Sequence, residues 1–201
     1  RAGNQLRLLR DGNEFFPCML QAIGGARRYV LLEMYLFESG VVADRFIDAL
    51  LLAARRGVWV HVLLDHFGAL GLGRGDLQRL RQGGVEVSFY NPLRIGKLFN
   101  NLARDHRKLL LVDGDTAFVG GVGITDDFDP PTATHRRWRE TMVEFSGPVV
   151  ADWQELFLRV WNAGGERRLQ LTPPVNPVIT RGMQARALVS AGLLRQENMR
   201  S

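Results

Sequence analysis

Two kinds of hydrophobic pattern alternate along this chain. In some stretches apolar residues recur every three or four positions, which is typical of an amphipathic helix, while others are short and almost continuously apolar, which is typical of a buried strand. Helices are predicted over residues 11–28, 42–56, 76–82 and 149–162, and strands over residues 29–37, 58–65, 85–90, 107–112, 115–120 and 141–145. Because strands and helices alternate in the first part of the chain, the order favours right-handed crossovers. We therefore expect an α/β fold with a mixed, mostly parallel β-sheet flanked by helices.

Local signals for turns and helix ends refine this picture. Asp113-Gly114 separates two strand-like runs and is among the strongest short signals for a β-hairpin. Asp11, with Glu14 three residues later, has the spacing of a capping box and predicts the start of the first helix.

The character of the chain changes near residue 164. Two glycines there are followed by a segment with three prolines, Pro173, Pro174 and Pro177, which is typical of a linker. We therefore expect residues 1–163 to form one globular unit and residues 164–201 to connect to something further. Residues 187–190 are a candidate for one more strand.

Composition excludes several classes of protein. At 46% hydrophobic and 23% charged residues, a chain of 201 residues can bury a core and is neither disordered nor collagen-like. Its single cysteine, Cys18, excludes an internal disulfide and a cysteine-based metal site. No apolar run reaches the roughly 18 residues of a membrane-spanning helix. The formal net charge of +5 favours anionic partners such as phosphates, nucleic acid or an acidic membrane surface, without choosing among them.

His106 and Lys108 are the residues in this chain that most clearly suggest chemistry. They stand two apart on a predicted strand, so their side chains lie on one face, and they end a basic run over residues 94–108. A lysine can stabilise negative charge on phosphate oxygens, and a histidine can act as nucleophile or as acid and base near neutral pH. This chemistry requires neither a metal nor a cofactor. The alternative interpretation is a basic surface strand with a solvated histidine.

The residues that follow extend this pair into a motif. It consists of His106, Lys108, Asp113, Gly120 and Gly121. The motif resembles the signature of the phospholipase D superfamily. Further features resemble that family at Glu33 to Phe37, Leu64-Asp65, Trp138 to Glu140 and Gly147-Pro148. Within the superfamily the chain is most similar, over about residues 5 to 162, to the N-terminal half of bacterial cardiolipin synthases and related phosphatidyltransferases.

The resemblance implies a role for each catalytic position. His106 corresponds to the histidine of a phosphohistidine mechanism, Lys108 to the phosphate-binding lysine and Asp113 to the motif aspartate. Asp113, however, has the opposite strand parity and stands at the predicted hairpin, so we expect a structural role for it, with direct chemistry as the alternative. Glu140 is a better candidate for the carboxylate that orients His106; the alternative is an exposed residue at the start of a strand.

Substrate-binding positions follow from the same resemblance. They are Glu33, Tyr35, Gly120, Gly121, Gly123 and Thr125. At the position of Gly123 the family usually has Asn or Ser, whose side chain helps to hold the phosphate. Backbone N–H groups of the glycine-rich turn, or the hydroxyl of Thr125, are the expected substitutes.

The family's active site combines two His/Lys sets, whereas this chain has one. The resemblance therefore implies a second His-x-Lys half, either on the same polypeptide beyond residue 164, which we favour, or in a homodimer. The implied function is a phosphatidyltransferase that acts on phospholipid as a peripheral protein at an anionic membrane, on the cytoplasmic side of the bacterial inner membrane. Two alternatives remain open: a phospholipase D-type phosphodiesterase or nuclease, and a weakly active basic module that binds lipid or nucleic acid.

Overall fold

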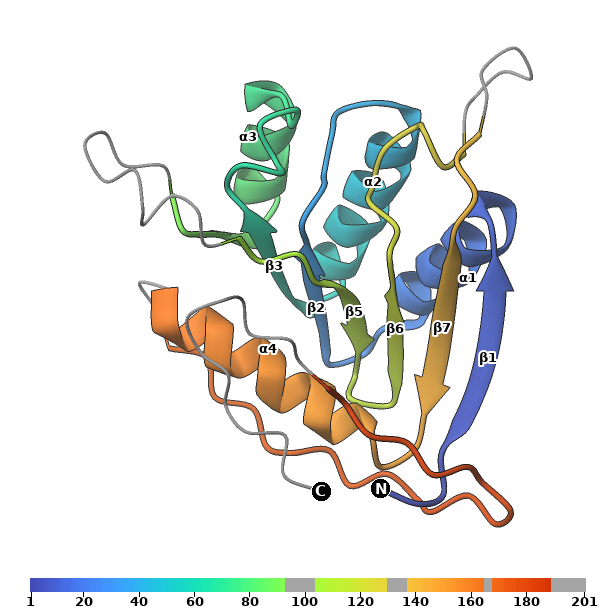
Figure 1. Ribbon diagram of the computed structural model, residues 1–201. Helices are drawn as coiled ribbons and strands as arrows, with labels where there is room; N and C mark the ends of the chain where they lie inside the picture. Colours follow the sequence, from blue (N-terminus) through green and yellow to red (C-terminus); the bar gives the residue numbers. More distant parts are fainter. Residues whose placement is uncertain (93–103, 130–136, 165–167, 189–201) are drawn as a thin grey trace.

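The computed structural model describes residues 1–92, 104–129, 137–164 and 168–188, and Figure 1 shows a sheet with helices on both faces. The elements in chain order are β1 (Gln5–Arg10), α1 (Gly12–Gly25), β2 (Tyr29–Met34), α2 (Val41–Arg55), β3 (Trp59–Asp65), α3 (Arg74–Gln82), β4 (Glu86–Tyr90), β5 (Lys108–Val112), β6 (Thr116–Gly120), β7 (Thr141–Ser146) and α4 (Val150–Gly164). The expected α/β class is confirmed.

The direction of the strands differs from the expectation. The sheet has the order β1-β7-β6-β5-β2-β3-β4, in which β2–β3 and β3–β4 are parallel and the other neighbours are antiparallel. The prediction of a mostly parallel sheet was therefore wrong. The crossovers through α2 and α3 produce the two parallel pairs, whereas the hairpin at Asp113-Gly114 and the returning strand β7 make the rest of the sheet antiparallel.

The two faces of the sheet belong to two separate cores. Val30 and Leu32 of β2 point into a cluster with α1, α2 and α3, while Tyr29 and Leu31 point into a smaller cluster with α4. This alternation is the two-residue period of a strand that is buried on both sides, so β2 has no exposed residue.

The first helix begins in a different way from the capping box that the sequence predicts. The Asp11 side chain makes no cap hydrogen bond, although Glu14 Oε2 does accept one from the backbone N–H of Arg10, at 2.8 Å. Asp11 instead binds Arg139 Nε and the backbone N–H of Glu140, and it has φ 61° and ψ 164°, a region that is almost restricted to glycine. These hydrogen bonds hold the start of β7 against the end of β1 although the Asp11 backbone is strained.

One edge of the sheet, at the top of Figure 1, holds the functional candidates other than Asp113, which follows the opposite end of β5. Strands β1 to β4 and β6 end there, and β5 and β7 begin there, because of the pairing directions above. We call it the upper edge. Ligand sites of α/β folds commonly lie at the carboxyl ends of the parallel strands.

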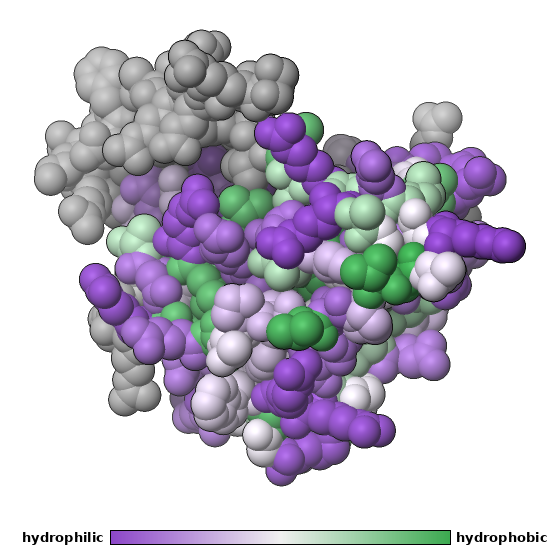
Figure 2. All heavy atoms as spheres, turned by 90° about the horizontal axis from the view of Figure 1, so that it is seen from below, coloured by the Kyte–Doolittle hydropathy of each residue, from purple (hydrophilic) through white to green (hydrophobic). Residues whose placement is uncertain are grey.

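Residues 168–188 cross the opposite, lower end of the molecule (Figure 1). Met183 forms a bridge with Asn4, and the side chain of Asn176 donates to the carbonyl oxygens of Gly114 and Gly147. Figure 2 shows this lower face as mostly hydrophilic with small apolar patches. In the strand suggested for residues 187–190, positions 187 and 188 are not in a strand and positions 189 and 190 lie outside the described residues.

Candidate active site

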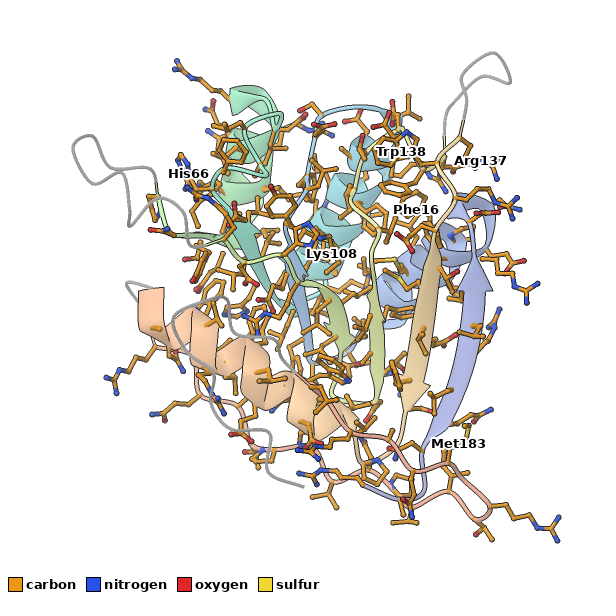
Figure 3. All side chains as sticks on the ribbon, in the orientation of Figure 1. Phe16, His66, Lys108, Arg137, Trp138 and Met183 are labelled. Atoms are coloured by element: carbon orange, nitrogen blue, oxygen red, sulfur yellow. The ribbon has the colours of Figure 1, made fainter. Side chains whose placement is uncertain are left out.

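His106 and Lys108 meet at the upper edge. Lys108 is the first residue of β5, and its Nζ lies 2.8 Å from His106 Nδ1 and donates to the His106 carbonyl oxygen at 2.7 Å. The lysine is 4% exposed, whereas His106 is exposed to solvent. Figure 3 shows Lys108 among the ends of the central strands. An exposed imidazole thus lies in contact with a buried ammonium at the upper edge.

Tyr35 joins this pair from the end of β2. Its ring centroid lies 4.5 Å from that of the His106 imidazole and 4.9 Å from Lys108 Nζ. A cation so close to an aromatic face is attracted by the ring quadrupole. The half-buried Tyr35 ring therefore forms one wall of the site.

The surroundings lower the pKa of both members of the pair. Burial lowers the pKa of Lys108 to about 8, although the negative charges of Asp105, Glu140 and Asp65 act in the opposite direction. Burial and the neighbouring Lys108 charge lower the pKa of His106 below its usual 6.5. At neutral pH the pair therefore consists of a neutral imidazole and a cationic lysine that is easily deprotonated.

Glu33, Asp105 and Arg107 lie beneath the pair, on the other side of the backbone. Arg107 Nη2 is 2.8 Å from Glu33 Oε1, and Arg107 Nε donates to Asp105 Oδ1 at 2.9 Å. Glu33, expected to bind substrate, is 1% exposed and faces Asp105 and Arg107 instead of solvent. Burial, followed by the neighbouring Asp105, raises the pKa of Glu33 well above its usual range. Burial also acts to raise the pKa of Asp105, but contacts with Glu33 and Arg107 outweigh it and the pKa is lowered.

Asp65, the last residue of β3, ties this layer to the next loop. One carboxylate oxygen accepts hydrogen bonds from the backbone N–H groups of Phe67 and Gly68 at 3.0 Å, and the other accepts one from Asp105 N–H at 2.9 Å. Its side chain is completely buried. The sequence analysis gave Asp65 only as a feature of the family resemblance and assigned no site role to Asp105 or Arg107; the signal available was the two-residue period, which puts Asp105 and Arg107 together on the face opposite to His106 and Lys108.

The glycine-rich turn after β6 is shaped by close approach. A Cβ on Gly121 would lie 2.3 Å from Glu140 Oε2, and one on Gly120 would lie 2.7 Å from the Thr141 carbonyl oxygen. These two glycines therefore allow the start of β7 to come close to the turn.

Gly123 and Thr125, which were also expected to bind substrate, are buried. A Cβ on Gly123 would lie 2.7 Å from the Cβ of Leu36. Thr125 is 5% exposed, and its hydroxyl donates to Glu38 Oε2 at 3.0 Å. The hydroxyl that was expected to replace the family's Asn or Ser is thus already bound to a carboxylate.

Glu140 stands at the border between this turn and a hollow. Among the described residues, the hydrogen bond to its carboxylate comes from its neighbour Thr141 N–H, at 2.8 Å, and His106 is not a partner. Its negative charge nevertheless acts on Lys108. The hollow has a volume of about 400 Å³ and is lined by Arg10, Asp11, Arg139, Glu140 and Thr141.

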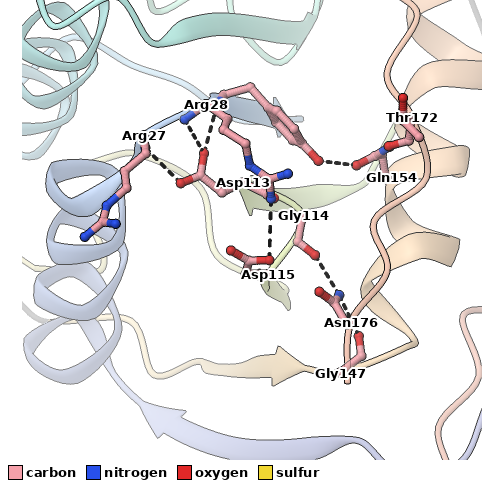
Figure 4. Close-up of polar contacts among 10 residues, drawn as sticks. Arg27, Arg28, Asp113, Gly114, Asp115, Gly147, Gln154, Thr172 and Asn176 are labelled. Carbon is pink, nitrogen blue, oxygen red and sulfur yellow. Dashed lines mark hydrogen bonds and ion pairs between the residues drawn. The ribbon is translucent and has the colours of Figure 1, made fainter. Parts of the chain in front are cut away.

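Asp113 follows the end of β5 that is opposite to Lys108, and Figure 4 shows its polar contacts. Its carboxylate accepts hydrogen bonds of 2.7 to 2.9 Å from three consecutive backbone N–H groups at the start of β2, those of Arg27, Arg28 and Tyr29. It is 8% exposed and has a positive φ of 55° in the hairpin turn. The motif therefore joins two separate places, the contact of His106 with Lys108 at one end of the strand and an anchored turn at the other.

Within the described ranges, no group of three or more His, Cys, Asp or Glu side chains is arranged to hold a metal ion. No helix in those ranges is long and apolar enough to cross a membrane. Of the basic run over residues 94–108, Arg94 and Lys97 lie outside the described residues.

Comparison with known proteins identifies the family. Residues 19–161 match the family described as "Cardiolipin synthase, PLD-like domain". The chain is 31% identical over 159 residues to the probable cardiolipin synthase YwiE of Bacillus subtilis, covering 79% of this chain and 32% of that protein. It is 38% identical over 165 residues to cardiolipin synthase A of Pseudomonas fluorescens, covering 80% of this chain and 34% of that protein. The chain thus spans about a third of the length of these relatives.

Solved structures of low sequence identity share the fold. Nuc from Salmonella typhimurium, a phospholipase D family member, matches with a TM-score of 0.61 and 20% identity, over 83% of this chain and 99% of that one. A phosphatidylserine synthase from Haemophilus influenzae matches with a TM-score of 0.63 and 15% identity, over 78% of this chain and 36% of that one. From the family match and the identities to the synthases, the chain belongs to the phospholipase D-like domain family of cardiolipin synthases.

Proposed function

We propose that this chain is the N-terminal half of a phosphatidyltransferase of the cardiolipin synthase type, which transfers a phosphatidyl group through a phosphohistidine intermediate. The observation that carries the proposal is the 2.8 Å contact between Lys108 Nζ and His106 Nδ1 at the upper edge, in a chain of this family. A nucleophile and a cation for the phosphate oxygens are the first two groups that the reaction needs.

The reaction has two steps. In the first, an imidazole nitrogen of His106 forms a bond to phosphorus, and the bond from phosphorus to the leaving oxygen breaks while that oxygen takes a proton from an acid in the second half. In the second, the acceptor hydroxyl gives a proton to the same group, its oxygen bonds to phosphorus and the phosphorus–nitrogen bond breaks. The charge of Lys108 stabilises the phosphate oxygens in both steps.

Substrate binding also changes the state of the histidine. An ammonium only donates hydrogen bonds, so in the free chain Nδ1 accepts and the ring proton lies on Nε2. A phosphate that binds Lys108 Nζ competes with Nδ1 and releases it. The ring proton then moves to Nδ1, and Nε2 becomes free to attack.

A second His-x-Lys half completes this site. Because the chain spans about a third of the length of the curated synthases, we infer that this half follows on the same polypeptide. Phospholipid is the inferred substrate, met at the cytoplasmic surface of the bacterial inner membrane.

A homodimeric phosphodiesterase is the second candidate. Nuc is matched over 99% of its length, so a chain with a single half is a complete member of this fold. Nucleic acid would then be the alternative substrate. A third possibility, a basic module that only binds anions, requires no turnover at all.

One set of assays separates these functions. The 201-residue chain, and the same chain joined to its natural downstream sequence, are incubated with phosphatidylglycerol vesicles and with single-stranded DNA, and products are followed by mass spectrometry. We expect lipid transfer by the longer protein, a drop of at least about a hundredfold in His106→Ala, and an acid-labile phosphoryl adduct on His106. His61→Phe, in the middle of β3, is the matched control and keeps activity. Turnover that persists in His106→Ala refutes the proposal, and turnover on DNA by a dimer of the short chain favours the second candidate.

A further inference from the structure

Asp105, His106, Arg107 and Lys108 alternate between two layers. His106 and Lys108 meet at the surface, while Asp105 and Arg107 meet below them. His106 precedes β5, so its backbone is not part of a paired strand and other contacts must position its ring. Besides the two contacts of Lys108 Nζ with His106, the segment is held from below, where Tyr35 N–H donates to the Arg107 carbonyl oxygen at 3.1 Å and Asp105 N–H donates to Asp65.

One guanidinium contacts two buried carboxyl groups in that layer, and a third carboxyl, that of Asp65, accepts a hydrogen bond from Asp105 N–H. The side chains of Glu33, Asp65 and Asp105 are 1%, 0% and 7% exposed, and that of Arg107 is 21% exposed. Arg107 contacts both Glu33 and Asp105, and it binds Asp105 through Nε at 2.9 Å and Nη2 at 3.2 Å. We refer to these four residues as the buried carboxyl cluster.

We propose that the buried carboxyl cluster is a positioning group for His106, in which Glu33 supports Arg107, Arg107 supports Asp105, and these contacts hold the imidazole against Lys108 and Tyr35. This inference rests on the proposed function and adds Glu33, Asp105 and Arg107 to it as residues that act through His106 without touching substrate.

Charge balance assigns a proton to Glu33. Two ionised carboxylates beside a single guanidinium would leave one buried negative charge uncompensated, which is costly where the carboxyl groups are buried. A proton on Glu33 removes that charge. The raised pKa of Glu33 and the lowered pKa of Asp105 agree with this distribution.

The other titratable groups that face the cluster are few among the described residues. Tyr90, from the end of β4, acts on Arg107, and Arg104 Nη1 lies 3.9 Å from Asp65 Oδ1. His106 and Lys108 face the cluster from above, and the negative charges of Asp65 and Asp105 act to raise the pKa of both. The cluster therefore affects the pair in two ways, by position and through the negative charge of Asp105.

The test uses variants that differ in one property each. Glu33→Gln keeps the shape and polarity of a neutral carboxyl, whereas Glu33→Leu keeps the volume and removes the polar group. Asp105→Asn removes the negative charge next to His106. Asp113→Asn, a buried carboxyl at the opposite end of β5, is the matched control. The imidazole of His106 is observed by nitrogen-15 NMR from pH 5 to 9 in the 201-residue chain, which requires no catalytic activity.

The expected results distinguish position from general stability. Glu33→Leu shifts and broadens the His106 signals and lowers kcat of the active protein on the order of tenfold with little change in KM. Glu33→Gln restores both, Asp105→Asn lowers the pKa of His106, and Asp113→Asn leaves His106 unchanged. His106 signals that stay the same in Glu33→Leu and Asp105→Asn overturn the inference. Glu33→Gln behaving like Glu33→Leu, or Asp113→Asn moving His106 equally, also overturns it. Failure of the proposed function appears separately, as turnover that survives in His106→Ala while the NMR results hold.

Discussion

Replacing Lys108 with methionine tests the electrostatics of the site directly. The lysine is 4% exposed, and burial lowers its pKa from 10.5 to about 8. This difference of about 2.5 corresponds to ~3.4 kcal/mol at about 1.36 kcal/mol per pH unit. The native state is destabilised by up to that amount below pH 8, where Lys108 is protonated in both the native and the unfolded chain.

Lys108→Met removes the charge and fills a similar volume. It also removes the two contacts of Nζ with His106, worth about 1 kcal/mol each. At pH 7 we therefore expect the variant to be more stable than the wild type by about 1 to 2 kcal/mol. Between pH 8 and 10.5 native Lys108 releases its proton while the unfolded chain keeps it, so the wild type gains up to ~1.4 kcal/mol per pH unit. The order of stability therefore reverses within this range, at about pH 9, above which the wild type is more stable.

The assay is urea unfolding followed by far-UV circular dichroism from pH 6.5 to 10.5. The difference between the two proteins in the free energy of unfolding removes the contributions of other titrating groups. One of these is Tyr29, whose pKa is raised to about 12 by burial. Lys108→Arg is the control, because it stays charged throughout the range and gains nothing from high pH. Stability curves of wild type and Lys108→Met that run parallel from pH 8 to 10.5 would refute the reasoning.

Three further predictions follow from the same geometry. Asp113→Ala leaves three backbone N–H groups at the start of β2 unpaired and should lower the free energy of unfolding by about 3 kcal/mol; an unchanged urea midpoint contradicts this. Gly123→Ala places a Cβ 2.7 Å from that of Leu36 and should lower the free energy of unfolding by about 1 to 3 kcal/mol. In a double-mutant cycle, Leu36→Gly should relieve this loss, so strictly additive effects of the two substitutions count against the prediction. The transfer rate should fall above about pH 8, as Lys108 loses its proton, and at acid pH, as His106 gains one below its usual pKa; a rate that stays constant to pH 10 excludes this role for Lys108.

The elements that the sequence predicted are those with local signals. The second helix, expected at 42–56, is α2 at Val41–Arg55, and the hairpin at Asp113-Gly114 is present, since apolar periodicity and turn residues act over short distances. Strand β1 was missed because in it only Leu9 is buried, as suits an edge strand. Strand direction was misjudged because it depends on which distant segments pair, and the pattern of one strand does not carry that information.

The candidate site divides in the same way. Because His106 and Lys108 stand two apart on a predicted strand, the sequence predicted that their side chains lie together. The roles assigned to them remain proposals. The layer beneath was not predicted, because Arg107 was counted as part of a basic run and Asp105 as its exception. Only the folded chain places these two against Glu33, which comes from a strand more than seventy residues earlier.

Strand β5 begins at Lys108 and ends one residue before Asp113. Lys108 has the parity of Leu110 and Val112, which face α1 to α3, whereas Leu109 and Leu111 face α4. Deleting or inserting one residue between the two ends would turn the lysine to the α4 face if the turn stayed anchored, or would detach the turn if the lysine stayed in place. The number of residues between lysine and aspartate is therefore set by the length and pleat of one strand, and not by any reaction that the two residues share.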